Sequence, residues 1–209
     1  MSLRWIKAQE LYNTLNQLQS GGFSQLSDPN YLLLIDARSM EDYEHYHIPT
    51  AIRPRGRVVT NEATNETITT MVLPYEPAIE AKQRIVVYDG DSKELSIDIS
   101  RPAVRVATAL SRAGAQVQVE VLYGGFEEFS ACYPFMRTTK TVFTQRELDD
   151  FEAYPVDIIG GCLYLGNIEQ AMKTEVRKNL KEVVKTKTRS KFLEIIQIIY
   201  LPFEIQLQA

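Results

Sequence analysis

The stretch "LLLIDARSMEDYEHYHIPTAI", residues 32–52, decides the fold of this chain. It begins inside a continuous apolar run, 31–36, which is typical of a strand that is covered on both faces. Ser39 stands where it can cap a short helix over 40–45, because a serine hydroxyl accepts a hydrogen bond from the first helical turn. A buried strand followed at once by a helix predicts a unit of an α/β domain.

Two further strands are expected downstream, at 84–88 and 119–125. Between them, Ser100 and Pro102 suit the N-cap and the first turn of a helix, and Gly114 suits its end. Strands that alternate with helices predict an α/β fold with a doubly wound, mostly parallel sheet.

The remaining segments are assigned by periodicity. Leucines recur on one face of "KAQELYNTLNQL" (7–18), which predicts an amphipathic helix. Residues 53–73 show no clear period, and we expect a long surface loop. A Thr-x-x-Glu capping box occupies 144–147. After it, "VDIIGGCLYLGN" (156–167) predicts a hairpin and 168–184 a helix.

Composition indicates a soluble globular protein, with 44% hydrophobic and 24% charged residues among 209. The net charge of -4 gives no reason to expect direct binding of nucleic acid. The charge is unevenly distributed, since 173–209 holds eight Lys or Arg against four Asp or Glu. The apolar run 192–209 contains Glu, Gln and Pro, and we do not expect it to span a membrane.

Two cysteines, Cys132 and Cys162, and two histidines are too few for a disulfide scaffold or a zinc site. Reduced thiols favour a cytoplasmic protein, and we expect no cofactor. The N-terminus has no apolar signal-peptide core. Its Arg4 and Lys7 leave a mitochondrial location open, although Glu10 soon follows.

Residues 32–52 resemble the signature of rhodanese-like domains, in which Asp-x-Arg ends a strand, an acidic helix follows, and His-Ile-Pro leads onward. The stretch "VLYGGFEEFSACYP" (121–134) is similar to the final strand of that family and its Gly-Gly-aromatic turn. The run "IVVYD" (85–89) stands where the family places the strand before its active loop. The resemblance covers about residues 5–137 and implies a rhodanese-like fold.

A second resemblance concerns "YPVDIIGGCLYLGNIEQA" (154–171), which is similar to the beginning of dual-specificity phosphatase domains. That order of domains resembles the MAP-kinase phosphatases and their pseudophosphatase relatives. The match ends near residue 181. The expected organisation is a rhodanese-like domain over 1–137, a linker over 138–154, and an incomplete dual-specificity-phosphatase-like C-terminal segment with a divergent tail over 155–209.

The resemblance places Asp89 at the position of the rhodanese nucleophile. Sulfur transfer needs a thiolate there, with loop N–H groups that stabilise the resulting anion. A carboxylate would instead repel thiosulfate. Asp91, Glu94 and Asp98 add negative charge to the loop. We expect a solvated acidic loop, and the functional alternative is a site for a cation or a basic partner.

The two cysteines do not form a phosphatase site in this sequence. Tyrosine-phosphatase chemistry needs Cys at i and Arg at i+6, but Cys132 has Thr138 and Cys162 has Ile168 at that spacing. Cys132 does have Arg137 five residues on, which is the rhodanese loop spacing. That segment follows a helix-like stretch, so we interpret the spacing as coincidence and predict no enzyme activity.

Other polar residues have a structural and a functional interpretation. Asp36, Arg38 and His47 are catalytic in type, but we expect them to tie the end of a strand to the next turn. A second set follows the His-Ile-Pro motif where MAP-kinase phosphatases carry a basic cluster that docks on an acidic kinase groove. We expect it to dock a partner, with a solvated loop as the alternative: Arg53, Arg55, Arg57, Val58 and Val59.

The sequence therefore predicts a catalytically inactive pseudophosphatase or adaptor that binds signalling proteins. The resemblance implies three kinds of partner, namely MAP kinases, a mitochondrial phosphatase and a stress-granule protein. The alternative class is an enzyme, either a sulfurtransferase or a dual-specificity protein phosphatase.

Overall fold

The computed structural model describes residues 3–20, 22–61, 66–73, 78–93, 100–141, 144–180, 185–187 and 196–199, and within them the side chains of 57–71, 145, 185–187 and 196–199 are not described. The chain forms two compact units, which we describe separately. The first contains residues 1–8 and 27–147, and the second contains residues 9–26 and 148–209. Every helix among the described residues is too short or too polar to cross a membrane.

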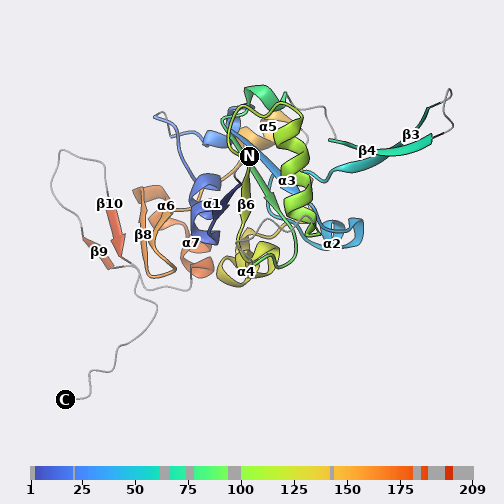
Figure 1. Cartoon of the computed structure of the whole chain (residues 1–209). Helices are drawn as coiled ribbons and strands as arrows, with labels where there is room; N and C mark the ends of the chain where they lie inside the picture. The colour runs from blue at the N-terminus through green and yellow to red at the C-terminus, as the bar shows by residue number, and fades with distance from the viewer. Residues whose placement is uncertain are drawn as a thin grey trace, which may run out of the picture. The chain divides into compact units, whose positions relative to one another are not determined.

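A four-stranded parallel sheet forms the centre of the first unit (Figure 1). Its strands are β1 (Arg4–Ile6), β6 (Glu120–Leu122), β5 (Arg84–Tyr88) and β2 (Leu32–Asp36), in that spatial order, and all neighbours run parallel. The prediction of a mostly parallel α/β sheet is confirmed. Its apolar runs are strands because both faces of the sheet are covered.

Helix α3 (Pro102–Arg112) packs against β5 and β6 and buries one face of this sheet. The core on that side includes Leu33, Ile35, Ile85, Val87, Ala103, Ala107, Leu110 and Val121. Strand residues of the opposite parity, Leu34, Val86 and Leu122, are buried as well. Each such side chain contributes on the order of 1.5–3 kcal/mol of hydrophobic stabilisation.

Three helices begin close to the carboxyl ends of the strands. Helix α2 (Met40–His45) is capped by Ser39, whose hydroxyl accepts from the N–H of Asp42, as predicted. Helix α4 (Gly125–Cys132) follows β6. The predicted Ser100 cap of α3 is wrong, because Arg101 is the N-cap residue and makes no side-chain cap bond. A carboxylate from another loop takes that role, as shown below.

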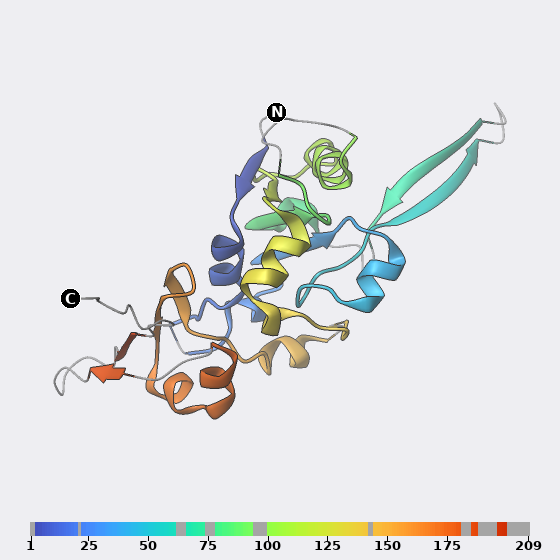
Figure 2. The ribbon, with the colours of Figure 1, turned by 90° about the horizontal axis from the view of Figure 1, so that it is seen from below.

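Residues 55–72 form an antiparallel hairpin of β3 (Arg55–Asn61) and β4 (Glu66–Val72), so the expected surface loop is wrong. The two strands pair only with each other among the described residues. Figures 1 and 2 show that the hairpin extends away from the parallel sheet of its unit. Its valines, isoleucine and threonines favour strand, and this preference outweighs the polar composition that suggested a loop.

In the second unit, α1 (Ala8–Leu15) accompanies the hairpin of β7 (Val156–Ile159) and β8 (Leu163–Gly166). Both the hairpin and the helix were predicted, although the helix ends before Leu18. The single helix expected over 168–184 is wrong. Two short helices, α6 (Ile168–Met172) and α7 (Thr174–Asn179), occur instead, because Lys173 between them is extended.

Strands β9 (Lys185–Lys187) and β10 (Ile196–Ile199) extend the β7–β8 hairpin to an antiparallel sheet of order β7-β8-β10-β9. The remaining elements are short: η1 (Gln25–Ser27), η2 (Ile79–Ala81), η3 (Pro134–Met136) and α5 (Gln145–Asp149). The predicted capping box before α5 is present, since Thr144 and Glu147 exchange hydrogen bonds.

Candidate functional site

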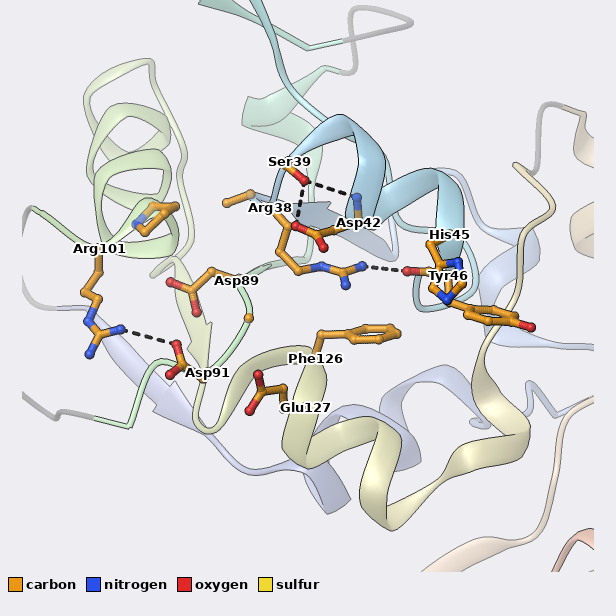
Figure 3. A pocket seen from close by; sticks show the side chains of 13 residues that line it. Arg38, Ser39, Asp42, His45, Tyr46, Asp89, Asp91, Arg101, Phe126 and Glu127 are labelled. Carbon is orange, nitrogen blue, oxygen red and sulfur yellow. Dashed lines mark hydrogen bonds and ion pairs between the residues drawn. The ribbon is translucent and has the colours of Figure 1, made fainter.

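The first unit has a cavity of about 550 Å³ at the carboxyl edge of its parallel sheet (Figure 3). This edge is where α/β domains bind ligands. The segments that line the cavity follow β2 and β5 or begin α3 and α4. They supply Ala37, Arg38, Ser39, Asp42, His45, Tyr46, Asp89, Gly90, Asp91, Arg101, Pro102, Phe126 and Glu127.

Asp89 follows β5 directly, and its carboxylate is bound by the chain itself. One oxygen accepts from the backbone N–H of Ser92 at 3.0 Å, and the other accepts from the Ser92 hydroxyl at 2.6 Å. The second oxygen also accepts from the N–H of Ala103 at 3.2 Å, in the first turn of α3. Asp89 is only 3% exposed. Its carboxylate thus occupies the position where the N-terminus of α3 could bind an anion.

The N–H groups at the start of α4 are also used. Phe126 donates to the carbonyl of Asp89 at 2.8 Å, and Glu127 donates to the carbonyl of Gly90 at 3.0 Å. Gly125 makes this approach possible: its φ is +55°, and a Cβ there would lie 2.4 Å from the Asp89 carbonyl oxygen. The two helix starts at the cavity therefore donate to the chain's own oxygens rather than to a ligand.

Arg38 forms one wall of the cavity and is paired with Asp36. Its Nη2 donates to Asp36 at 2.6 Å and to the Tyr46 carbonyl at 2.7 Å, and its guanidinium lies 3.8 Å from the ring centre of Phe126. Burial opposes the charge, but the hydrogen bond and charge of Asp36 outweigh it and raise the pKa of Arg38. Asp36 is fully buried, and its negative charge is balanced by the positive charge of Arg38.

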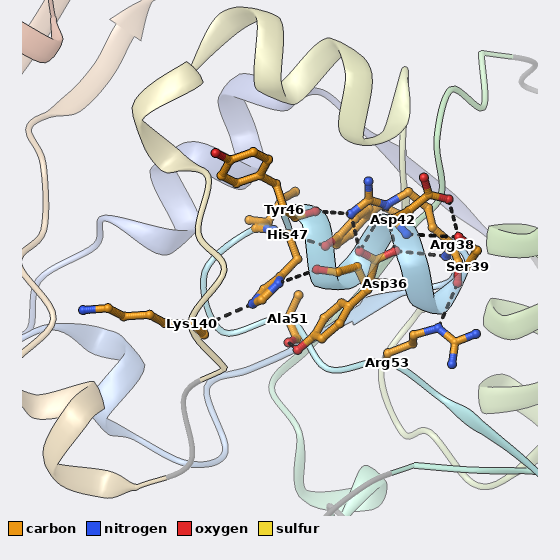
Figure 4. A network of polar contacts seen from close by, with 12 residues as sticks. Asp36, Arg38, Ser39, Asp42, Tyr46, His47, Ala51, Arg53 and Lys140 are labelled. Atoms are coloured by element: carbon orange, nitrogen blue, oxygen red, sulfur yellow. Dashed lines mark hydrogen bonds and ion pairs between the residues drawn. The ribbon is translucent and has the colours of Figure 1, made fainter.

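A polar network continues from this pair into the core (Figure 4). His47 is buried, its ring stacks on Tyr43, and its ring nitrogens lie 2.9 Å from the Tyr43 carbonyl and 3.2 Å from the Lys140 carbonyl. Tyr88 accepts from the N–H of Ile48 at 3.2 Å. Burial and the charge of Asp36 raise the pKa of Tyr88 well above 10.0. The hydrogen bonds by which Asp36, Arg38 and His47 were expected to tie the strand end to the next turn are present.

The charge of the cavity is negative. Four carboxylates line it, from Asp42, Asp89, Asp91 and Glu127, against two arginines, Arg38 and Arg101. Arg101 lies 3.3 Å from Asp91, and both side chains are exposed. Among the described residues, no three His, Cys, Asp or Glu side chains are grouped so that they could hold a metal ion.

The comparison with protein families decides the relationship of the chain. The rhodanese-like domain matches residues 22–132, which is more than half of the 209 residues. The chain belongs to the rhodanese-like family. A search of the curated proteins found no match.

Neither cysteine is among the residues that line the cavity. Cys132 is the exposed last residue of α4 and does not line the cavity, and Arg137 donates to the Pro134 carbonyl at 3.0 Å. Cys162 is an exposed residue of the β7–β8 turn in the second unit. The structure does not place Cys132 and Arg137 in a loop that follows a strand.

The residues expected to dock a partner begin at the base of the β3–β4 hairpin. Arg53 is partly buried, and its Nε donates to the Arg38 carbonyl at 3.1 Å. Arg55 is exposed at the start of β3. The backbone of Arg57, Val58 and Val59 continues β3, but their side chains lie outside the description. The structure therefore ties Arg53 to the domain and leaves Arg55 accessible.

The expected solvated acidic loop is wrong for Asp89 and right for Asp91. Asp89 is buried because Ser92 and Ala103 supply donors, whereas the Asp91 side chain is 57% exposed. Glu94 and Asp98 lie outside the described residues. A signal was available in the Asp-x-x-Ser spacing of 89–92, which is typical of side chains that cap a turn. Nothing in the sequence indicated that Phe126 and Glu127 also line this site.

Proposed function

We propose that this rhodanese-like chain is a binding protein without catalytic power, a pseudophosphatase or adaptor that binds and regulates signalling proteins. The observation that carries the proposal is the bound carboxylate of Asp89. An anion at the carboxyl edge would need the N–H donors that Asp89 and the neighbouring carbonyls already occupy. A sulfurtransferase must form an anionic sulfur adduct at this position, and a second negative charge beside Asp89 is strongly disfavoured.

The C-terminal part supports the same proposal by its resemblance to dual-specificity phosphatases. The resembling segment supplies β7, β8 and α6, and no Cys-x5-Arg sequence occurs in the chain. A phosphatase of this type cannot form its cysteinyl-phosphate without that cysteine and its phosphate loop. We therefore place the chain with pseudophosphatases similar to serine/threonine/tyrosine-interacting-like proteins, with a truncated phosphatase-like segment over 155–209.

We assign partner docking to the basic residues at the base of β3. The resemblance to MAP-kinase phosphatases suggests an acidic groove on a MAP kinase as the partner surface. A mitochondrial phosphatase and a stress-granule protein are the other partners that the resemblance suggests. Arg55 is exposed, and an arginine fork pairs well with a carboxylate.

The enzymatic alternative is tested with the purified full chain. We expect no thiocyanate from thiosulfate plus cyanide, and no hydrolysis of an aryl phosphate, above the buffer rate. Asp89→Cys should not create sulfur transfer, because the α4 donors remain bound to the Asp89 and Gly90 carbonyls. Turnover by the wild-type chain that disappears in Cys132→Ser or Cys162→Ser would refute the proposal.

Docking is tested with the double variant Arg55→Ala/Arg57→Ala, in which Arg53 is kept because it holds the Arg38 carbonyl. At low salt, we expect the double variant to capture less of a purified MAP kinase than the wild-type chain does. At high salt the two proteins should capture equal amounts, because surface charges are screened. The matched control, Arg105→Ala/Arg112→Ala, removes two exposed arginines of α3. Equal capture by both double variants would remove β3 as the docking site.

A further inference from the structure

The guanidinium of Arg38 has donors that the chain does not use. Its Nε and Nη2 donate to Asp36, and Nη2 also reaches the Tyr46 carbonyl. Among the described residues, its Nη1 has no hydrogen-bond partner, although the side chain is only 9% exposed. Figure 3 shows the guanidinium in the cavity, beside Phe126. This free N–H group at the wall of the cavity favours a ligand with an oxygen acceptor.

The rest of the cavity limits the charge of that ligand. The exposed carboxylates of Asp42, Asp91 and Glu127 line it; the charge of Asp42 acts on Arg38, and Glu127 has no ion-pair partner among the described residues. The Arg38 charge is already balanced by Asp36. An anionic acceptor would therefore be repelled by the carboxylates. A ligand that carries a neutral carbonyl beside a cation would suit both the Arg38 N–H and the carboxylates.

From the free Arg38 N–H and the exposed carboxylates, we infer that the cavity binds a basic peptide segment of a protein partner. A backbone carbonyl of the segment accepts from Nη1 of Arg38, and an arginine or lysine side chain pairs with Glu127 and Asp42. The inference rests on the proposed binding function and specifies the chemistry of one partner. It concerns a site different from β3, which would meet an acidic surface.

The size and the chemistry of the cavity fit this ligand. Its volume of about 550 Å³ lies within the roughly 300–1,000 Å³ of ligand pockets. The chain's own arginines already show how guanidinium groups bind here. Arg38 lies over Phe126 between a carboxylate and a carbonyl, and Arg101 pairs with Asp91. A guanidinium from a partner would pair with a carboxylate in the same way, at Glu127 and Asp42.

The test uses the full chain and a fluorescein-labelled peptide of four Gly-Arg repeats, followed by fluorescence anisotropy. The matched peptide replaces arginine with citrulline, which keeps the size and removes the charge. We expect saturable binding of the arginine peptide only. Glu127→Gln should weaken it about two- to fivefold, as for a solvent-accessible ion pair. The control Glu44→Gln removes an exposed carboxylate of α2 that does not line the cavity, and should leave binding unchanged.

Two further readouts locate the ligand and identify its class. The backbone amide signals of Arg38, Phe126 and Glu127 should shift in NMR spectra when the arginine peptide is added. Spermidine, a cation without a carbonyl, should displace the peptide only at concentrations at least about tenfold higher than unlabelled peptide. Equal displacement would make a free polyamine the ligand and overturn the assignment.

Equal binding of the citrulline peptide, or shifts confined to residues outside the cavity, would also overturn it. The failures of the two proposals are distinguishable. Turnover in the enzyme assays would refute the proposed function whatever the peptide does. An inactive protein that shows no arginine-dependent binding would refute only the peptide site.

Discussion

The carboxylate of Asp89 accepts a hydrogen bond from the backbone N–H of Ala103, fourteen residues further along the chain. This contact joins the end of β5 to the first turn of α3, where Arg101 provides no side-chain cap. A helix start has unsatisfied N–H groups and a positive dipole end, so a buried carboxylate stabilises it. Asp89 therefore has a structural role, because its carboxylate caps the first turn of α3.

Replacing Asp89 should cost stability. We expect Asp89→Ala to lower the free energy of unfolding by about 2–4 kcal/mol, because the donors of Ser92 and Ala103 lose their acceptor in a buried place. Asp89→Asn keeps one acceptor oxygen and should cost less, about 1–2 kcal/mol. Urea unfolding followed by circular dichroism measures both. The control Asp91→Ala removes an exposed, ion-paired carboxylate and should change stability by less than about 0.5 kcal/mol. Equal losses at 89 and 91 would contradict this role.

The parallel sheet could be predicted because its strands carry their signal locally. The runs around Leu34 and Val86 are continuously apolar, and both residues are buried. The hairpin over 55–72 could not be predicted in this way, because its two strands pair only with each other among the described residues. Their sequence shows no clear apolar period, so its polar residues suggested a loop.

The candidate site was predictable in position but not in its contacts. Asp89 could be singled out because it follows a buried strand, and strand ends are where α/β domains place their sites. The partners Ala103 and Phe126 depend on where α3 and α4 begin in space. Spacing along the chain carries no information on that, so the hydrogen bond from Ala103 to Asp89 and the contact of Arg38 with the Phe126 ring came from the fold alone.

Thr50 is a strained position whose replacement should stabilise the protein. Its φ is +68°, in the left-handed region, and its buried hydroxyl has no hydrogen-bond partner. A β-branched residue there costs about 1–2 kcal/mol, partly offset in a glycine variant by greater freedom of the unfolded chain. We expect Thr50→Gly to raise the free energy of unfolding by about 1 kcal/mol. Thr50→Ala, which keeps the strain, should gain less. A glycine variant no more stable than the alanine variant would refute the strain argument.

Tyr88 should make the domain sensitive to high pH. Because burial and the charge of Asp36 raise its pKa well above 10.0, the folded state keeps the phenolic proton after the unfolded state has lost it. The stabilisation is complete below pH 10 and declines as the pH rises further. Tyr88→Phe loses the hydrogen bond from Ile48 and should be less stable at pH 7. Above pH 10, the unfolding free energy of the variant should fall less steeply with pH than that of the wild type. The two slopes should differ by up to about 1.4 kcal/mol per pH unit. Urea unfolding at pH 7, 10 and 11 checks this, and a constant difference between the two proteins would contradict it.

Within the second unit, the side chain of Asn13 on α1 binds the backbone of β7 as a neighbouring strand would. Its amide donates to the Asp157 carbonyl at 2.8 Å, and its oxygen accepts from the Asp157 N–H at 2.7 Å. Tyr12 adds a bond from its hydroxyl to the Pro155 carbonyl at 2.9 Å, and Asn16 accepts from the N–H of Tyr154 at 2.8 Å. The β7–β8 hairpin is thus held by a helix from the other end of the sequence.

This arrangement predicts that the β7 backbone opens when Asn13 is removed. Asn13→Ala leaves the Asp157 N–H without its acceptor, although Asp157 is only 1% exposed, at a cost of about 1–3 kcal/mol. Hydrogen exchange of the Asp157 amide, read by NMR on the full chain, should accelerate about fivefold to a hundredfold. The amide of Val87 in the first unit should be unchanged, and Lys7→Gln, an exposed residue just before α1, serves as the matched variant. Unaltered exchange at Asp157 would mean that the hairpin is stable without α1, and that a segment starting near residue 148 can fold by itself.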